Sequence, residues 1–371
     1  MLASLAVLIL VSLPAAAQQT VRFPAKGQVP AGYPAQYATI VAAAEREGNL
    51  VIHSTTDLAI AAPVIDDFQA LYPRIEVQYQ DMNSTDLYNT YLSDVLTSPT
   101  TADVVWSSAM ELQFRIVDAG QAEPYDSPEA AKLPGWAIWK NLAFGTTYEP
   151  IVIAYNRRQL APDEVPQSHA DLTRLLTEKR GRFAGKVATY DVERSGLGFL
   201  LAAQDQRASE QYWPLAAALG AAGARTVATT EAILAGVGSG GDLIGYNALG
   251  SYANRDAKPE SAVGIVFPQD YTLVVTRVMF VGKKAVNPNA AKLWVDYLLS
   301  PRGQKALADR AGLAPIRTDV ESANSATAIA ATLGARARPI AVGPDLIGPF
   351  AEPAKRLAFL RQWKEAMGVK R

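Results

Sequence analysis

Cysteine is absent from the 371 residues, and histidine occurs only twice, as His53 and His169. Without thiols the chain has no disulfide, cysteine nucleophile, thiolate metal site or acylated lipoprotein cysteine. Two histidines are too few for a histidine-cluster metal site. Charge of one sign is also lacking, since 35 Lys and Arg face 36 Asp and Glu. This balance argues against nucleic acid or an anionic membrane surface as a partner.

Catalytic motifs are missing as well. No serine stands in the G-x-S-x-G pattern. Gly236, Gly238 and Gly241 satisfy G-x-G-x-x-G, but they follow a predicted helix and precede a predicted strand, the reverse of a dinucleotide site. His53 is predicted to pack inside a strand, and His169 to have a capping or surface role at a helix start. We therefore predict no enzyme and no cofactor.

The N-terminus has the form of an export signal. An apolar run over residues 2–13 is followed by three alanines at 15–17, which form an A-x-A cleavage site before Gln18. The run is shorter than the roughly 20 residues that a membrane-spanning helix needs. We predict a cleaved signal peptide over residues 1–17 and a periplasmic protein that is not embedded in the membrane.

Short apolar strands alternate with amphipathic helices from Tyr33 onward, which is typical of an α/β fold with largely parallel sheets. A new strand begins at 151, and a long β-branched run over 271–281 is predicted to return the chain to the first part. The predicted lobes are 33–150 plus 271–313, and 151–270 plus 314–371. Two crossing segments would form a hinge, with a ligand cleft at the carboxyl ends of the strands.

Hydroxyl side chains follow several predicted strands and open the helices that come next. The residues concerned are Ser54, Thr55, Thr56, Ser107, Ser108 and Ser195. Helix N-termini attract anions, and Arg194 would add guanidinium donors suited to a carboxylate or a phosphate. Each hydroxyl taken alone is better explained as a helix cap. Their shared position at strand ends favours an anion site, with Arg194 as the main charge partner.

Two tyrosines lie where the last strand of the second lobe enters its helix. Tyr246 is followed by Asn247, and Ser251 precedes Tyr252. The rings could stack on a ligand, donate hydrogen bonds to it, or bind ferric iron as phenolates. Packing as half-buried aromatics is the structural alternative. We predict that these four residues line the wall of the cleft opposite the hydroxyl loops.

Several ordered motifs resemble one family. They occupy residues 103–113, 148–156, 190–199, 246–252 and 270–304. They are similar to motifs of the bacterial extracellular solute-binding proteins grouped with ferric-iron-type ABC transporters. The resemblance implies a two-lobed periplasmic-binding-protein fold of type II. It further implies a monomer that closes on a solute and delivers it to a membrane permease and its ATPase.

The resemblance leaves the solute open. Relatives that bind ferric iron use neighbouring tyrosines with a histidine or acidic ligand, whereas here Asn247 and Ser251 interrupt the tyrosine pair. The hydroxyl loops and Arg194 favour a small organic anion, such as a phosphorylated sugar or acid or a phosphonate, and no metal. Two alternatives remain: a ferric-iron protein that uses Tyr246 and Tyr252, and a ligand-sensing subunit for a membrane sensor kinase.

Overall fold

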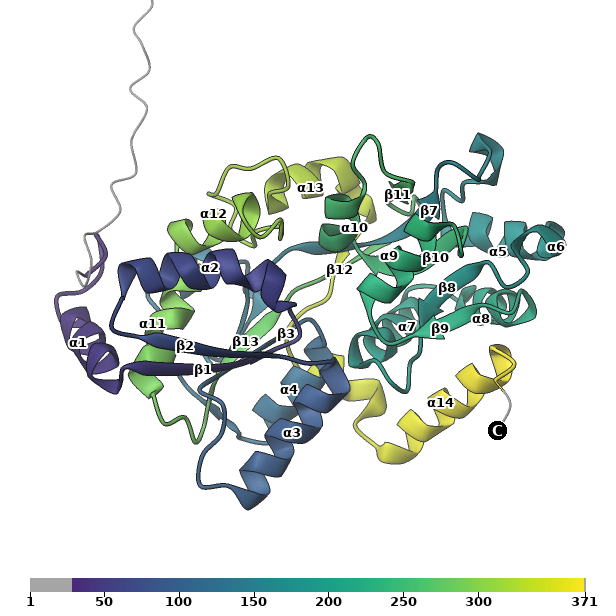
Figure 1. Ribbon diagram of the computed structural model, residues 1–371. Helices are drawn as coiled ribbons and strands as arrows, with labels where there is room; N and C mark the ends of the chain where they lie inside the picture. Colours follow the sequence, from purple (N-terminus) through teal and green to yellow (C-terminus); the bar gives the residue numbers. More distant parts are fainter. Residues whose placement is uncertain (1–28, 370–371) are drawn as a thin grey trace, which may run out of the picture.

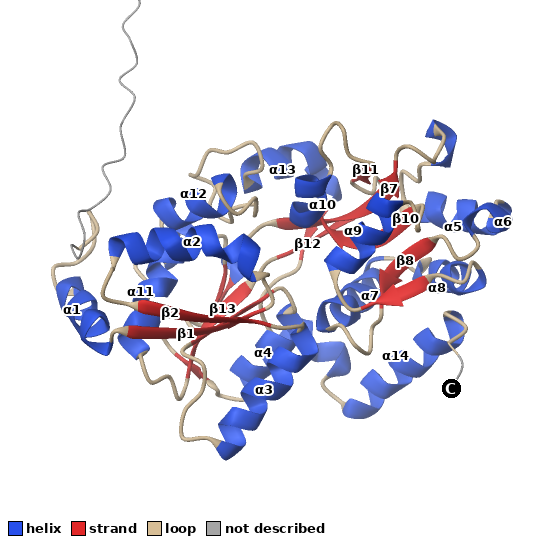
Figure 2. Ribbon diagram, viewed as in Figure 1, coloured by secondary structure: helices blue, strands red, loops and turns tan. Residues whose placement is uncertain are grey.

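The computed structural model describes residues 29–369, which form two lobes, each built on a β-sheet with helices packed around it (Figures 1 and 2). The predicted signal peptide, residues 1–17, and the expected start at Gln18 lie outside the described residues. Within the described part of the chain, no helix is both long enough and apolar enough to cross a membrane.

Lobe 1 contains the first sheet. Its strands are β1 (Asn49–Ser54), β2 (Glu76–Asp81), β3 (Val104–Ser107), β4 (Ala122–Glu123), β5 (Ile138–Trp139), β6 (Ala143–Gly145) and β13 (Val278–Gly282). Its helices are α1 (Tyr37–Glu47), α2 (Leu58–Leu71), α3 (Ser84–Thr97), α4 (Met110–Asp118), α11 (Pro288–Leu299) and α12 (Pro301–Asp309). The strand order is β2-β1-β3-β13-β6-β5, with β4 paired to β13.

Lobe 2 contains the second sheet. Its strands are β7 (Glu149–Asn156), β8 (Val187–Tyr190), β9 (Arg225–Val227), β10 (Ile244–Leu249), β11 (Val263–Val266), β12 (Thr272–Val275) and β14 (Ala337–Pro339). Its helices are α5 (His169–Glu178), α6 (Arg180–Phe183), α7 (Gly196–Ala208), α8 (Tyr212–Ala221), α9 (Thr230–Ser239) and α10 (Gly250–Asp256). The order is β14-β12-β7-β10-β8-β9, with β11 paired to β7.

The C-terminal segment contacts both lobes. It contains α13 (Ala326–Leu333) and α14 (Pro353–Ala366), of which the sequence predicted only the second, and it supplies β14 to the second sheet. Phe359 of α14 packs on Phe199 in lobe 2, whereas Arg356 forms an ion pair with Glu111 of α4 in lobe 1. The yellow helix below lobe 2 in Figure 1 is α14. Short 3-10 helices lie at Ala130–Lys132, Gly135–Ala137, Pro162–Glu164, Gly334–Arg336, Pro344–Leu346 and Gly348–Phe350.

Two crossing segments join the lobes. The chain passes from β6 to β7 through residues 146–148 and returns from β12 to β13 through residues 276–277. The run 271–281, expected as one strand, is therefore two strands in different sheets. The second crossing comes later than the expected boundary at 271, because β12 pairs with β7 and β14 of lobe 2.

The sheets are mixed, so the prediction of largely parallel sheets is wrong. The strand β1 pairs in parallel with β2 and β3, but β13 is antiparallel to β3 and β6. In lobe 2, β7 is antiparallel to β10, β11 and β12. The crossings explain part of this pattern, because the chain leaves lobe 1 through one segment and returns through the other. The strands attached to the two crossings therefore run in opposite directions.

Candidate functional site

A cavity of about 240 Å³ lies between the lobes, and both lobes contribute to its walls. Lobe 1 supplies Thr55, Asp57, Asp81, Met82, Asn83, Ser84 and Ser108. Lobe 2 supplies Tyr190, Ser195, Leu197, Ala228, Thr229, Thr230, Glu231, Leu249 and Tyr252. At the rim the lobes touch, because the Gly196 N–H donates to Ser84 Oγ at 2.9 Å and the Thr85 hydroxyl donates to the Arg194 carbonyl at 3.1 Å.

Five helices of nine or more residues begin at this cavity, and so does the short α10, whose N-cap residue Leu249 lines it. The N-cap residues of α2, α3, α7 and α9 line it directly, and Ser108 of the lining precedes the N-cap of α4. Their side chains cap three of the helices: Asn83 Oδ1 accepts from Thr85 N–H, Ser195 Oγ from Gly198 N–H, and Thr229 Oγ1 from Ala232 N–H. Because the N-terminus of a helix carries a partial positive charge, the cavity lies where several such charges converge.

Three carboxyl groups also line the cavity. Asp81 Oδ2 accepts from the Leu58 N–H at 2.8 Å and so holds the first turn of α2. Asp57 is the N-cap residue of α2, but its side chain makes no capping hydrogen bond. Burial, followed by repulsion from Asp57, raises the pKa of Glu231 to about 7. The sequence did not identify Asp81 or Glu231 as site residues, and it treated Asp57 only as a possible cap.

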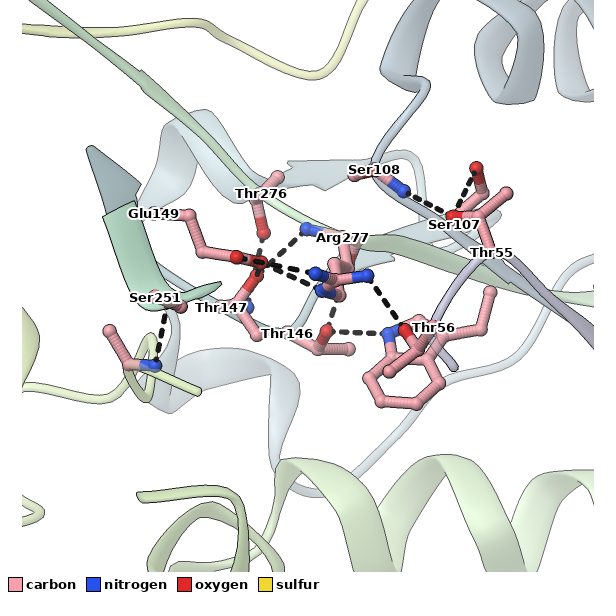
Figure 3. Close-up of polar contacts among 12 residues, drawn as sticks. Thr55, Thr56, Ser107, Ser108, Thr146, Thr147, Glu149, Ser251, Thr276 and Arg277 are labelled. Atoms are coloured by element: carbon pink, nitrogen blue, oxygen red, sulfur yellow. Dashed lines mark hydrogen bonds and ion pairs between the residues drawn. The ribbon is translucent and has the colours of Figure 1, made fainter. Parts of the chain in front are cut away.

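Of the six predicted hydroxyl residues, Thr55, Ser108 and Ser195 line the cavity. The other three are buried in structural hydrogen bonds. Ser54 Oγ donates to the Trp106 carbonyl at 2.8 Å. Ser107 Oγ accepts from the Thr55 hydroxyl at 3.1 Å, as Figure 3 shows. The third, Thr56, accepts from Arg277 at the crossing between the lobes. Hydroxyls that follow a strand therefore alternate between facing the cavity and holding the loop.

Arg194, which the sequence predicts as the main charge partner, does not line the cavity. It is exposed in the turn before α7 and is absent from the cavity lining. Its N–H donates to Asp191 Oδ1 at 3.1 Å, and its carbonyl accepts from Thr85. The main chain of Arg194 thus fixes the turn at the rim of the cavity. A local sequence signal could not show which way this side chain points.

Arg277 is a fully buried cation at the second crossing between the lobes. Its Nε donates to Glu149 Oε1 at 2.8 Å, and its Nη1 donates to Thr56 Oγ1 at 2.8 Å. Figure 3 shows the guanidinium between these two partners. The guanidinium carbon of Arg277 lies 5.2 Å from the ring centre of Tyr252, a residue of the cavity wall. Arg277 therefore ties the second crossing to β7 and to the loop that leads into Asp57.

The predicted aromatic wall is only partly present. Tyr252 lines the cavity, and burial raises its pKa well above the usual range of a phenol. Tyr246 and Asn247 do not line it, because their side chains donate to the buried Asp205 carboxylate at 2.7 Å and 2.8 Å. Ser251 accepts from the Ala314 N–H at 3.5 Å, also outside the lining (Figure 3). The ferric alternative therefore lacks a shared site for Tyr246 and Tyr252.

Both histidines are buried. His53 packs within β1, as predicted, and no hydrogen-bond partner of its Nδ1 is found among the described residues. The predicted capping or surface role of His169 is wrong. Its Nδ1 lies 2.9 Å from Asp270 Oδ1, its ring stacks on Tyr271, and Ser168 provides the helix cap. Asp270 and Asp205, both in lobe 2, hold this ring in place.

The lining residue Glu231 and its neighbours were missed because the short strand before them was not recognised. The strand β9 spans only Arg225–Val227, and Thr229 then caps α9. The dipeptide Thr229-Thr230 before an acidic residue is a helix-start signal that could have identified this loop. A similar signal precedes α3, because Asp81 ends a strand that the sequence predicts and Asn83 lies directly before the helix.

Two lobes joined by two crossings, with a polar cavity lined by both, define a hinged binding protein. The chain matches the family described as bacterial extracellular solute-binding protein over residues 64–332. It therefore belongs to this family, and the resemblance seen in the sequence motifs is confirmed.

Solved structures agree with this assignment. The substrate-binding protein of an ABC transporter from Agrobacterium tumefaciens is 35% identical, with a TM-score of 0.82, and the match covers 86% of this chain and 94% of that one. AfuA from Actinobacillus pleuropneumoniae, with fructose-6-phosphate bound, is 17% identical with a TM-score of 0.70 over 87% and 99% of the two chains. Iron-bound HitA from Pseudomonas aeruginosa is 18% identical with a TM-score of 0.63 over 86% and 99%. The latter two show a shared fold alone. No curated protein matches the sequence.

Proposed function

We propose that this protein is the solute-binding component of an ABC importer. It would be exported to the periplasm, bind a small polar solute with an anionic group between its lobes, and deliver the solute to the permease and its ATPase. Family membership and the similarity to the Agrobacterium substrate-binding protein support the transport role. N-terminal sequencing of the protein from its host should find Gln18 as the first residue, and an uncleaved chain would contradict export by this signal.

The convergence of five helix N-termini on one cavity carries the proposal of an anionic group. An anion at a single exposed helix N-terminus gains about 0.3–1 kcal/mol, and more where water is excluded. The hydroxyls of Ser108 and Ser195 supply neutral donors at the same place, and Thr55, whose hydroxyl donates to Ser107, holds the adjoining loop. Arg194 has no part in the proposed site, because its side chain is exposed outside the lining.

Thermal unfolding of the mature protein tests the proposal. The panel contains phosphorylated sugars and acids, phosphonates, sulfonates, dicarboxylates, sulfate and ferric citrate. A solute at 100 times its dissociation constant adds roughly 2.7 kcal/mol of stability, which raises the melting temperature measurably. We expect a rise with one class of organic anion. The absence of any rise with the organic anions would refute an anion site.

A site variant checks where the solute binds. The Thr55 hydroxyl lines the cavity, donates to Ser107 Oγ at 3.1 Å and accepts from the Ser108 N–H at 3.3 Å. Thr55→Val removes these bonds and loosens the cavity wall, so it should weaken binding by roughly 0.5–1.5 kcal/mol, or about 2- to 12-fold. The control, Thr177→Val, changes an exposed hydroxyl on α5 and should leave affinity unchanged. Equal affinities of the two variants would place the solute elsewhere.

Two further experiments address the alternative functions. A visible charge-transfer colour with ferric citrate that is lost in Tyr252→Phe would favour iron, although Tyr246 is held by Asp205 at a separate place. Identification of the membrane protein that copurifies with the liganded form separates transport from signalling. A permease supports our proposal, and a sensor kinase would replace it.

A further inference from the structure

Two carboxyl groups from different lobes face the same cavity. Asp57 is the N-cap residue of α2 in lobe 1, and Glu231 lies in the first turn of α9 in lobe 2. The two carboxyl groups interact directly, because repulsion from Asp57 and a hydrogen bond with it both contribute to the raised pKa of Glu231. None of the lining residues in the described part of the chain is Lys, Arg or His. The cavity thus combines positive helix ends with a pair of carboxyl groups that no lining cation neutralises.

The fold does not use these two carboxyl groups for its own capping. Asp81 bonds to the first turn of α2 in place of Asp57, whose side chain makes no capping hydrogen bond. The Thr229 hydroxyl caps α9, while Glu231 Oε1 is buried with no hydrogen-bond partner among the described residues. A buried carboxylate oxygen without a partner is costly, because it loses its hydration without replacement.

The buried cation Arg277 adjoins Tyr252 of the cavity wall, but it is hydrogen-bonded to other groups. Its guanidinium donates to Glu149 and Thr56 and does not line the cavity. Closure of the lobes therefore brings Asp57 and Glu231 together with no side-chain cation between them. Like charges that share a buried site repel each other strongly, and such a pair favours a bound positive charge or a shared proton.

We propose that the solute is a zwitterion whose ammonium or guanidinium group binds between Asp57 and Glu231 while its anionic group lies at the helix N-termini. This inference rests on the proposed function. The solute's cationic group would replace the repulsion between the lobes with two charge-assisted hydrogen bonds, one to each lobe. Closure would then depend on the cationic end of the solute as well as the anionic end. The cavity of about 240 Å³ is smaller than the roughly 300–1,000 Å³ of drug-sized sites, so the zwitterion is small.

Paired compounds that differ only in the amine test the inference by titration calorimetry. The pairs are phosphoethanolamine and ethyl phosphate, 3-aminopropylphosphonate and propylphosphonate, taurine and ethanesulfonate, and β-alanine and propionate. We expect one zwitterion to bind at least about 30-fold more tightly than its partner without the amine. An amine-free anion that binds as tightly as its zwitterion overturns the inference but leaves the proposed function standing. If no compound binds, both fail.

Variants locate the cationic group. Glu231→Gln and Asp57→Asn should each weaken the zwitterion at least about 30-fold and leave the weak binding of its amine-free partner unchanged or improved. Asp66→Asn, an exposed position on α2, is the control and should bind as the wild type does. Glu231→Gln should melt at or above the wild-type temperature, because it relieves repulsion. Unchanged zwitterion affinity in Glu231→Gln overturns the inference and favours a proton shared by the two carboxyl groups.

A divalent cation is the remaining occupant to exclude. MgCl₂, CaCl₂ and MnCl₂ are added alone in the thermal assay. We expect no stabilisation. Stabilisation by one of these metals that disappears in Glu231→Gln would overturn the inference in favour of a metal site.

Discussion

Replacement of Arg277 by methionine should destabilise the whole protein. The side chain is 0% exposed, as is Glu149, its partner across the two crossing segments. The substitution removes the bonds of 2.8 Å to Glu149 and to Thr56. Glu149 would keep the bond from the Thr147 hydroxyl at 2.8 Å, but its charge would remain buried without a cation. Burial lowers the pKa of Arg277, but the charge and hydrogen bond of Glu149 together with the neighbouring tyrosines raise it above its usual value, so the guanidinium is charged.

Removal of one partner from a buried ion pair typically costs about 3–5 kcal/mol, because the other charge stays buried and unpaired. We expect Arg277→Met to lower the free energy of unfolding by this amount. Guanidinium chloride unfolding, followed by circular dichroism, measures the change. The unfolding of both lobes should shift, because Arg277 and Glu149 belong to the crossings that join them.

The double variant Arg277→Met, Glu149→Gln is the internal control. It removes the unpaired charge as well, so it should recover at least about 1 kcal/mol relative to Arg277→Met alone. A loss below about 1 kcal/mol in the single variant would refute the reasoning. The same conclusion would follow if the double variant were less stable than the single one, because the cost would then not come from the stranded carboxylate.

Three other predictions concern closure, the rim and pH. A Cβ at Gly196 would lie 2.3 Å from the Leu112 side chain of the other lobe. Gly196→Ala should therefore weaken solute binding at least about fivefold in calorimetry, with no loss of unliganded stability. The control Gly198→Ala meets a side chain of its own lobe and should lower the melting temperature instead. Arg194→Ala should change affinity by less than about threefold, since its side chain is exposed, and a larger loss would restore it to the site. Burial raises the pKa of Asp296 to about 6, so the folded state keeps a proton that the unfolded chain releases near pH 4. The free energy of unfolding should therefore fall by about 3 kcal/mol between pH 4 and 6. Either no fall, or the same fall in Asp296→Asn, would contradict this.

Local signals in the sequence predicted many elements with accurate bounds. The sequence predicts a helix from Tyr37 to Glu47 that ends at Gly48, and α1 spans these residues and ends where Gly48 adopts a left-handed φ of 70°. Such signals lie within a few neighbouring residues, so they can be read from the chain alone. The break at residues 276–277 has no local signal, because both halves of the run are β-branched and both are strands. Only pairing with different sheets separates β12 from β13.

Side-chain direction limited the prediction of the site. Thr55 and Ser108 line the cavity, whereas their neighbours Thr56 and Ser107 hold the loops. Arg194 follows the same rule, because its main chain holds the turn at the rim while the residue is exposed and does not line the cavity. Adjacent residues in a loop face opposite sides, so a motif locates the loop but does not choose the residue.

The sequence by itself determined the α/β class, the two-lobed family, the hydroxyl-rich loops and the absence of thiol chemistry. These properties follow from composition, periodicity and motifs that are local in the chain. The tertiary structure alone decided that Arg277 rather than Arg194 is the central cation, and that Asp57 and Glu231 share one cavity. Asp57 and Glu231 lie on different lobes, and only the packing of the lobes around the two crossings brings them together.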